Sequence, residues 1–535
     1  MKFSGKIVKI PFPFTDLSGN KSRPALVVSE PDAYGDLKVL FITTSNARSF
    51  GQVLELSNEC YSGEPLPFAS KLHLDKAYLL SKDLIVKTLA AVTDKFLEQV
   101  LRSLVMTATT DHQTTKNSAR DFVPGRSRVQ YAGRVFDAHE VKNAVSASLD
   151  FWLTEGRFSE EFAEKIADFL DIDEVLLTNS GSSANLLAFS ALTSEKLGER
   201  RLKPGDEVIS VAAGFPATIT PILQNGLVPV YVDVSIPTYN IDIDMLKKAI
   251  TPKTRGVFLA HTLGNPFDLD AVVELCEQHD LWLIEDNCDA FGSTYKGKKT
   301  GTFGHLSTIS FYPAHHITTG EGGAICTNDP QLAQLVRAFR DWGRDCYCAG
   351  GENNTCGKRF TQQFGTLPKG YDHKYVYSEI GYNLKMTDIQ AAIGAAQMEK
   401  LPAFCEQRKA NFRRYLEIFE PWKEFFVLPE ATPGSDPAWF SFIITVKENA
   451  PLTRDQLTAE LNARLIETRN LFAGNMTRQP AFVSRPGRIA DHLQNTDKIM
   501  NNTFFLGTYP GLTSAMLDYT EEVLRDFIQR AAVVA

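Results

Sequence analysis

The pattern of hydrophobic and polar residues changes near residue 129 and divides the chain into two parts. Before that point, short runs rich in β-branched and aromatic residues are separated by turn residues, as at 6–10, 25–29 and 38–44. These runs predict strands, and a helix is expected to follow them at 94–105. The strands and the helix together predict a small β-rich domain over residues 1–108. Residues 109–128 are polar and contain few large apolar side chains, which predicts a linker.

After residue 129 the pattern alternates between buried strands and segments of helix length. Apolar runs suited to buried strands occur at 175–178, 207–211, 227–234, 256–260, 281–285 and 308–311. The alternation predicts a mostly parallel sheet with helices on both faces, over residues 129–400. A long helix is expected to follow, then a strand at 442–446 and a helix at 453–465. Residues 401–535 are therefore expected to form a smaller C-terminal domain.

Composition narrows the class of protein without deciding it. With 43% hydrophobic and 22% charged residues, the chain has the balance of an ordinary globular protein. Its net charge of -8 does not favour a nucleic-acid or membrane partner for the chain as a whole. No apolar run is long enough to span a bilayer, and the N-terminus lacks the features of a signal peptide. We therefore expect a cytoplasmic protein whose eight cysteines are reduced thiols or metal ligands.

Two segments carry residues suited to a phosphate-bearing cofactor. The segment NSGSSAN at 179–185 lies between a predicted strand and a predicted helix, where hydroxyl and backbone N–H groups can bind a phosphate. Serines that only cap the N-terminus of the helix, without binding a phosphate, would give the same sequence pattern. In LIEDNCDA at 283–290, Asp286 follows a buried strand, where a carboxylate can pair with a pyridine nitrogen. A helix-capping aspartate is the alternative there.

Together with SFYPAHHITTGEGG at 310–323 and GYNLKMTD at 381–388, these segments resemble the DegT/DnrJ/EryC1/StrS family of pyridoxal-phosphate enzymes. The resemblance runs from about Arg128 to the C-terminus and implies an α/β fold, that of the fold-type I pyridoxal-phosphate transferases. It implies that Asp286 pairs with the cofactor ring, and that Asn383 reaches the phosphate in the neighbouring subunit of a homodimer. The cofactor-binding residues would be Gly181, Ser182, Phe215, Asp286, Ser310 and Asn383.

Two positions depart from the family pattern. His315 stands at the place of the cofactor-binding lysine, and Asp289 stands where the family usually has glutamine. An imidazole cannot form the covalent bond that lysine forms with the cofactor, but it can transfer protons near neutral pH. The departures imply that pyridoxamine phosphate is held without a covalent tether and that His315 catalyses a dehydration rather than amino transfer. A structural histidine in an inactive enzyme is the alternative.

Four cysteines form the pattern C-x57-C-x-C-x7-C: Cys288, Cys346, Cys348 and Cys356. Four thiolates beside a cofactor suit an iron–sulfur cluster or zinc, and the spacing favours the cluster because zinc sites usually contain two short C-x2–4-C pairs. With His315, this spacing resembles the members of the family that dehydrate a CDP-linked 4-keto-6-deoxyhexose. The resemblance implies a 3-dehydratase of O-antigen dideoxysugar synthesis, with a [2Fe-2S] cluster and an NADH-dependent iron–sulfur flavoprotein reductase as partner.

The first 108 residues resemble the PemK/MazF-type toxins, which are small SH3-like β-barrel endoribonucleases. The resemblance is clearest over residues 6–28, and it implies an RNase site at Arg23 with Thr43 or Thr44. An arginine can stabilise charge on a scissile phosphate. The charges of this part nearly balance, which gives weak support for RNA binding. An inactive barrel that serves as a passenger or interaction module remains the alternative.

The sequence therefore predicts a sugar 3-dehydratase with a toxin-like N-terminal domain. A dehydratase of the same cofactor class without a cluster is one alternative, and an RNA-cleaving protein with a regulatory C-terminal part is another. An ordinary aminotransferase is disfavoured by His315 and Asp289. Arg469 is a candidate for substrate binding, by its position in the C-terminal part.

Overall fold

The computed structural model describes residues 2–13, 20–43, 53–66, 70–116, 122–348 and 351–534. The chain forms two compact units, which are treated separately below. The first unit contains Met1–Ala119 and Asp137–Asp150, and the second contains Arg120–Phe136 and Phe151–Ala535. No helix among the residues that the structure describes combines the length and apolar character needed to span a bilayer.

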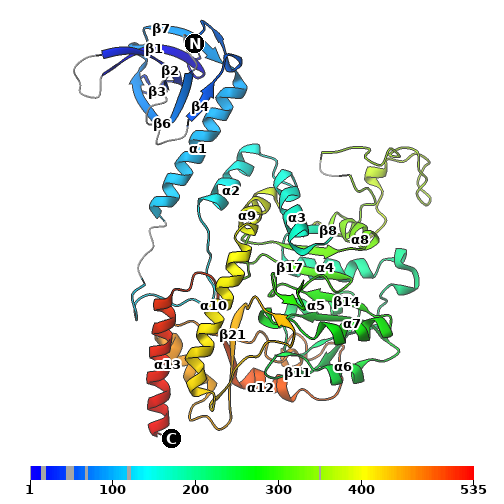
Figure 1. Cartoon of the computed structure of the whole chain (residues 1–535). Coiled ribbons are helices and arrows are strands. Elements are labelled where there is room, and N and C mark those ends of the chain that lie inside the picture. The colour runs from blue at the N-terminus through cyan, green and yellow to red at the C-terminus, as the bar shows by residue number, and fades with distance from the viewer. Residues whose placement is uncertain are drawn as a thin grey trace. The chain divides into compact units, whose positions relative to one another are not determined.

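The first unit is built on a curled antiparallel sheet of seven strands in the order β4-β6-β3-β2-β1-β7-β5 (Figure 1). Their bounds are β1 Lys6–Pro13, β2 Asn20–Val27, β3 Asp36–Thr43, β4 Val53–Leu56, β5 Tyr61–Gly63, β6 Ser70–Ser81 and β7 Lys87–Val92. Alternate side chains such as Ile7, Leu26, Leu40 and Leu72 meet in a buried core. The sheet confirms the small β-barrel class expected from the sequence.

Helix α1 (Asp94–Lys116) is longer than the sequence predicted. It continues through the first residues of the expected linker, and the hydroxyls of Thr107 and Thr109 donate to backbone carbonyls one turn earlier. Such local bonds let threonine remain in a helix that its propensity does not favour. Helix α2 (Ala138–Asp150) groups with this unit as well, since Arg102 forms an ion pair with Asp150 at 2.9 Å.

The second unit is organised by an eight-stranded sheet in the order β23-β10-β9-β13-β14-β17-β18-β8. Its strands are β8 Glu174–Thr178, β9 Glu207–Val211, β10 Val228–Val232, β13 Thr254–Ala260, β14 Trp282–Asp286, β17 Leu306–Ser310, β18 Gly323–Thr327 and β23 Arg488–Ile489. From β23 to β17 all neighbours are parallel, whereas β18 pairs antiparallel with both β17 and β8. The mostly parallel sheet is the one that the sequence predicted.

Helices cover both faces of this sheet (Figure 1). They are α3 Arg157–Leu170, α4 Gly181–Leu192, α5 Pro216–Gln224, α6 Ile243–Ala249, α7 Leu269–Gln278, α8 Pro330–Arg340 and α9 Asp388–Met398. Neighbouring strand residues face opposite ways: Val257 packs in the core under α6 and α7, and Phe258 in the core under α4, α5 and α8. A strand buried on both faces explains the continuous apolar runs in the sequence.

The expected strand at 227–234 is interrupted at Asp233. The buried Asp233 carboxylate accepts hydrogen bonds from the backbone N–H and the hydroxyl of Thr496, which turns the chain away from the sheet after β10. Small pairs and ribbons lie beyond the main sheet: β11 Val234–Ser235, β12 Asn240–Ile241, β15 Thr294–Tyr295, β16 Lys298–Lys299 and β20 Ser435–Asp436.

The C-terminal part begins with the long helix α10 (Leu401–Phe419) and contains a four-stranded sheet in the order β19-β21-β24-β22. Its other elements are β19 Phe426–Val427, β21 Ser441–Val446, α11 Arg454–Ala463, β22 Arg469–Asn470, α12 Gln494–Asn502, β24 Thr503–Gly507 and α13 Ser514–Val534. Phe412 and Trp439 stack at 3.9 Å in its core. One strand returns to the large sheet: β23 pairs with β10, and Arg488 contacts Glu207 at 2.8 Å.

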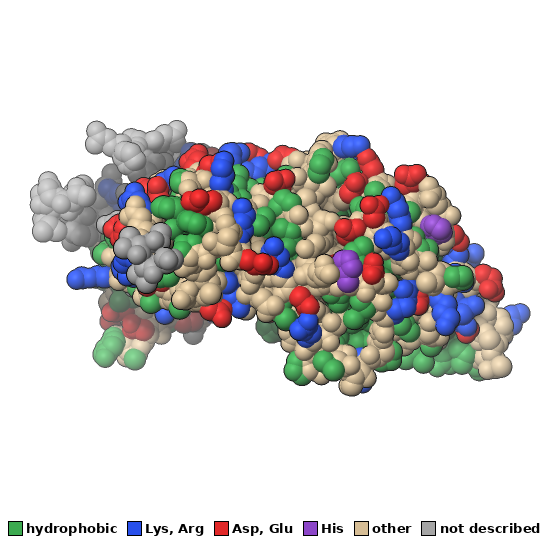
Figure 2. All heavy atoms as spheres, turned by 90° about the horizontal axis from the view of Figure 1, so that it is seen from below, with side chains coloured by type: hydrophobic (Ala, Val, Ile, Leu, Met, Phe, Trp, Pro, Cys, Tyr) green, Lys and Arg blue, Asp and Glu red, His purple; other side chains and the backbone are tan. Residues whose placement is uncertain are grey.

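The surface carries charges of both signs. On the face shown in Figure 2, basic and acidic side chains are interspersed, and neither sign forms a continuous patch. That face therefore offers no extended basic surface of the kind that binds a nucleic-acid backbone.

Candidate active site

A cavity of about 460 Å³ opens where the parallel strands end, beside Ala260 of β13, Asp286 of β14 and Ser310 of β17. Open α/β sheets generally bind ligands at this edge. Most of the residues that the sequence singled out line the cavity: Gly181, Ser182, Phe215, Asp286, Cys288, Ser310, His315 and Arg469. Among the residues that the structure describes, no lysine does so.

The start of helix α4 forms one wall of the cavity. Ser180 is the N-cap, and its hydroxyl accepts a hydrogen bond from the backbone N–H of Ser183 at 3.1 Å. Glycine at 181 is required by a close approach, since a Cβ there would lie 2.4 Å from the Cβ of Ser310. The first N–H groups of the helix and two serine hydroxyls thus meet in one cradle that suits a phosphate.

Asp286 is held in a fixed orientation at the end of β14. Its Oδ2 accepts hydrogen bonds from Asn185 Nδ2 at 3.0 Å and from the Thr218 hydroxyl at 2.8 Å. Thr308 donates to the Asn185 carbonyl oxygen, which leaves the Asn185 NH2 group to face the carboxylate. The sequence interpretation missed Asn185 and Thr218. Asn185 lies four residues after Gly181 on the same helix face, which is the signal that could have identified it.

His315 contacts Asp289, so the two departures from the family pattern meet in space. His315 Nε2 lies 3.3 Å from Asp289 Oδ1, and both side chains are largely buried. The imidazole packs edge-on against Phe440 and Tyr312, with ring centroids 5.7 and 6.1 Å away. His315 Nδ1 has no hydrogen-bond partner in the described part of the chain. Asp289 was noted in the sequence as a departure but not as a site residue.

His316, the next residue along the chain, points away from the cavity. It is buried, and its Nε2 donates to the carbonyl of Ala438. Burial, helped by the positive charge of Arg408, holds the pKa of His316 well below its usual range. The ring therefore stays neutral and takes no part in the cavity.

The mouth of the cavity is aromatic and carries one cation. Phe215 is half exposed and contacts Phe472 edge-on at 5.7 Å. The Arg469 guanidinium lies 4.0 Å from the ring of Tyr131 and 3.8 Å from the Glu467 carboxylate. Because Arg469 sits on β22, the C-terminal part of the chain supplies this charge to a cavity built mainly by the large sheet.

Asn383 does not line this cavity. Its Oδ1 accepts a hydrogen bond from Lys385 Nζ at 3.0 Å, and its backbone pairs with Asp341. The Lys385 ammonium also lies 3.8 Å from the ring of Trp342. The expected contact of Asn383 with a neighbouring subunit stays a prediction.

The four cysteines of the predicted cluster do not line one cavity. Cys346, Cys348 and Cys356 surround a small cavity with His373, whereas Cys288 lines the large one. Within the described ranges, no group of three or more His, Cys, Asp or Glu side chains is placed to hold a metal ion. The physical reason is that the rigid end of β14 holds Cys288, while ion pairs within their own loop, such as Arg359–Asp372 at 2.7 Å, hold the other three.

Comparisons with known proteins agree with this geometry. Residues 136–525 match the DegT/DnrJ/EryC1/StrS aminotransferase family. The lipopolysaccharide biosynthesis protein RfbH of Salmonella typhimurium is 56% identical over 410 residues, which cover 77% of this chain and 94% of that protein. A dTDP-4-dehydro-2,6-dideoxy-D-glucose 3-dehydratase of Saccharopolyspora spinosa is 51% identical, over 77% of this chain and 89% of that protein.

This chain belongs to the DegT/DnrJ/EryC1/StrS aminotransferase family.

A solved relative carries the cofactor. The E. coli GDP-4-keto-6-deoxy-D-mannose-3-dehydratase with bound hydrated PLP has a TM-score of 0.67 and 29% identity, and the match covers 74% of this chain and 100% of that one. The fold of this unit thus occurs in a solved structure with PLP bound.

Residues 4–106 match the PemK-like, MazF-like toxins of type II toxin–antitoxin systems. Arg23 is exposed on β2, and Thr43 is the last residue of the neighbouring strand β3. Thr44, the alternative to Thr43, lies outside the described residues. The RNase role of these residues stays a prediction.

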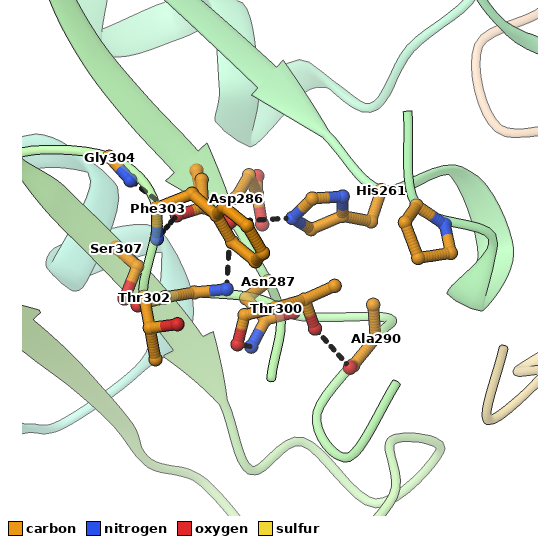
Figure 3. Close-up of polar contacts among 12 residues, drawn as sticks. His261, Asp286, Asn287, Ala290, Thr300, Thr302, Phe303, Gly304 and Ser307 are labelled. Atoms are coloured by element: carbon orange, nitrogen blue, oxygen red, sulfur yellow. Dashed lines mark hydrogen bonds and ion pairs between the residues drawn. The ribbon is translucent and has the colours of Figure 1, made fainter. Parts of the chain in front are cut away.

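A buried polar network supports the strand end that carries Asp286 (Figure 3). Glu285 is fully buried, and its carboxylate contacts His261 Nε2 at 3.0 Å. It also accepts hydrogen bonds from the backbone N–H groups of Gly301, Phe303 and Gly304. Burial opposes ionisation, but His261 and these N–H groups outweigh it and hold the pKa of Glu285 below its usual range.

We expect Glu285→Gln to destabilise the fold by about 3–5 kcal/mol, because an amide cannot replace a buried carboxylate among four donors. The contribution of Glu285 is fully present above the ordinary pKa of 4.5 and is lost as the pH falls through the lower pKa of the folded state. Denaturant unfolding at neutral pH measures the loss. Glu277→Gln, on the exposed side of α7, is the matched control. Equal stability of the two variants would contradict this account.

Proposed function

We propose that this chain is a pyridoxamine-phosphate-dependent 3-dehydratase of a nucleotide-linked 4-keto-6-deoxyhexose, in dideoxysugar and lipopolysaccharide biosynthesis. One observation carries the proposal: His315, at the sequence position where the family has its lysine, lines the cavity and contacts Asp289 at 3.3 Å. Relatives at 56% and 51% identity, named for lipopolysaccharide biosynthesis and for 3-dehydration of a sugar nucleotide, support it.

The residues around the cavity fit this cofactor. The start of α4, with Gly181, Ser182 and Ser310, would hold the phosphate, in a cradle that a Cβ at 181 would fill. Asp286 would keep the ring nitrogen protonated, and Phe215 would cover the ring. When bound, pyridoxamine phosphate supplies an amino group for the keto carbon of a sugar and a ring that accepts electrons.

Asp289 Oδ1 lies 3.3 Å from His315 Nε2, whereas His315 Nδ1 is buried without a partner among the described residues. A carboxylate beside Nε2 can orient the imidazole and stabilise its protonated form. His315 would take a proton at Nε2 and return it to a departing hydroxyl, so that the net chemistry is loss of water. Phe440 and Tyr312 flank the ring and limit the access of bulk water.

We expect His315→Asn to slow the loss of water by about 10²–10⁴-fold, because the acid–base group is gone. Asp289→Asn should slow it by about 10–100-fold, since the imidazole loses the group that orients it. Both variants should still bind pyridoxamine phosphate. Single-turnover NMR with CDP-, GDP- and dTDP-linked 4-keto-6-deoxyhexoses measures the rate and the nucleotide preference. Asp491→Asn, on the exposed surface, is the control, and a wild-type rate for His315→Asn would reject the proposal.

We further propose a specific substrate, an iron–sulfur cluster and a redox partner. It names a CDP-linked 4-keto-6-deoxyhexose, a [2Fe-2S] cluster on Cys288, Cys346, Cys348 and Cys356, and an NADH-dependent iron–sulfur flavoprotein reductase. In these terms the chain would be a CDP-6-deoxy-L-threo-D-glycero-4-hexulose-3-dehydrase. The cysteine spacing and the gathering of three thiols in one loop support it. As they stand, the four thiols do not fit one cluster, because Cys288 lines the other cavity.

We expect anaerobically purified protein to contain iron and acid-labile sulfide in equal amounts. Cys346→Ser and Cys356→Ser should lose both, since a thiolate ligand is removed. Cys60→Ser, in the N-terminal unit, should keep both and serves as the control. Zinc in place of iron, or iron that survives both loop substitutions, would favour the dehydratase without a cluster.

We also propose a homodimer in which Asn383 reaches the cofactor phosphate of the partner. Large apolar side chains are exposed around this residue, among them Ile380 at 94% and Tyr377 at 52%. Surfaces of this kind mark protein interfaces. Lys385 donates to the Asn383 oxygen, and the Asn383 NH2 group has no partner within the described ranges, so it could donate to a phosphate.

RNA cleavage by the N-terminal unit is a second candidate function, favoured by the family match and by the exposure of Arg23. We expect Arg23→Ala to abolish cleavage of single-stranded RNA by the full chain, because the charge that would face the scissile phosphate is lost. Lys95→Ala, which removes an exposed charge from α1, should not. If neither wild type nor variant cleaves RNA, the unit is a passenger or interaction module.

A further inference from the structure

Arg408 is a buried cation; burial opposes its charge and the charge of Asp289 favours it, although no ion pair between the two occurs among the described residues. It projects from helix α10 and is 1% exposed. Among the fully buried side chains of the described residues, it belongs to the largest residue by volume. No carboxylate of the described residues forms an ion pair with it. An unpaired charge is costly to bury, so a guanidinium kept there must meet other strong acceptors.

Backbone carbonyls take the place of that acid. Arg408 Nη2 donates to the carbonyl of His315 at 3.0 Å and lies 3.5 Å from that of Ala314. Arg408 Nη1 donates to the carbonyl of Phe440 at 3.2 Å. The two ends of one planar group therefore hold two segments that are far apart in the sequence: the loop after β17, and the residues that lead into β21.

These two segments together shape the surroundings of the imidazole. The ring of Phe440 lines the cavity and packs against His315. Next to it, His316 donates to the carbonyl of Ala438, which gives a second link between the same segments. Within the loop itself, the His315 N–H bonds only to the carbonyl of Tyr312, in a single turn. The position of the imidazole therefore depends on the contacts that other segments make with this loop, and Arg408 supplies such contacts.

We propose that Arg408 is a positioning residue for His315, holding the loop against the segment before β21 so that the imidazole stays on Asp289. The proposal rests on the function proposed above for His315. Burial lowers the pKa of Arg408 to about 10, so the group keeps its charge and all its donors near neutral pH. A lysine has a single point of donation and cannot reach both segments at once.

Arg408→Lys and Arg408→Gln separate positioning from general stability. For Arg408→Lys we expect kcat to fall about a hundredfold, since a displaced catalytic group loses rate steeply, while the affinity for pyridoxamine phosphate and KM change by less than about twofold. Lys409→Gln changes the next residue of α10, which pairs with Glu406 and Asp436 at the surface, and should leave all of these values unchanged.

A crystal structure of each variant gives a readout that does not need activity. We expect the contact of 3.3 Å between His315 Nε2 and Asp289 Oδ1 to be lost in Arg408→Gln. If it persists in both variants, or if both fail to fold or lose cofactor and rate together, Arg408 is a structural residue and the proposal is wrong. Failure of the wild type to dehydrate a sugar nucleotide would reject the proposed function but leave this structural test intact.

Discussion

The contact between His315 and Asp289 joins two loops that leave neighbouring strands of the parallel sheet. Strands β14 and β17 pair in register up to Asp286 and Thr308, so both loops emerge at the same edge. His315, the proposed acid–base group, and the Asp289 carboxylate are thus brought together by backbone pairing, next to the helix start that suits a phosphate. A lysine at 315 would not need such a partner, whereas an imidazole does, because its two nitrogens are chemically distinct.

The charged groups around the cavity are satisfied in different ways, and this restricts where proton transfer can occur. Asp286 is held by an amide and a hydroxyl, and Glu285 by His261 and three backbone N–H groups. Arg408 is held by backbone carbonyls at Nη1 and Nη2, while its Nε has no partner among the described residues. These contacts fix the orientation of each group. His315 lines the cavity beside Asp289, whereas His261 and His316 do not line it, so His315 is the histidine placed to exchange a proton there.

The sequence predicted the large sheet well because a strand buried on both faces leaves a continuous apolar run, as at 256–260 in β13. It predicted many of the residues that line the cavity because glycine and serine at a helix start, and an acid at a strand end, have local signatures. Contacts that depend on the tertiary structure could not be predicted from the sequence. One such contact is the pairing of β23, from the C-terminal part, with β10 in the large sheet. Another is the binding of Arg408 to backbone carbonyls, which every residue has and which the sequence therefore cannot single out. The spacing of the cysteines also could not show that Cys288 faces a different cavity from the other three.

In the proposed mechanism the cofactor lies beside His315 without a covalent bond to the protein. Borohydride treatment of the complex with pyridoxal phosphate, followed by peptide mass mapping, detects any such bond. We expect that no lysine of the wild-type chain carries the reduced cofactor in stoichiometric amount, and that His315→Lys acquires the label at position 315. A stoichiometric label on any lysine of the wild-type chain would contradict it.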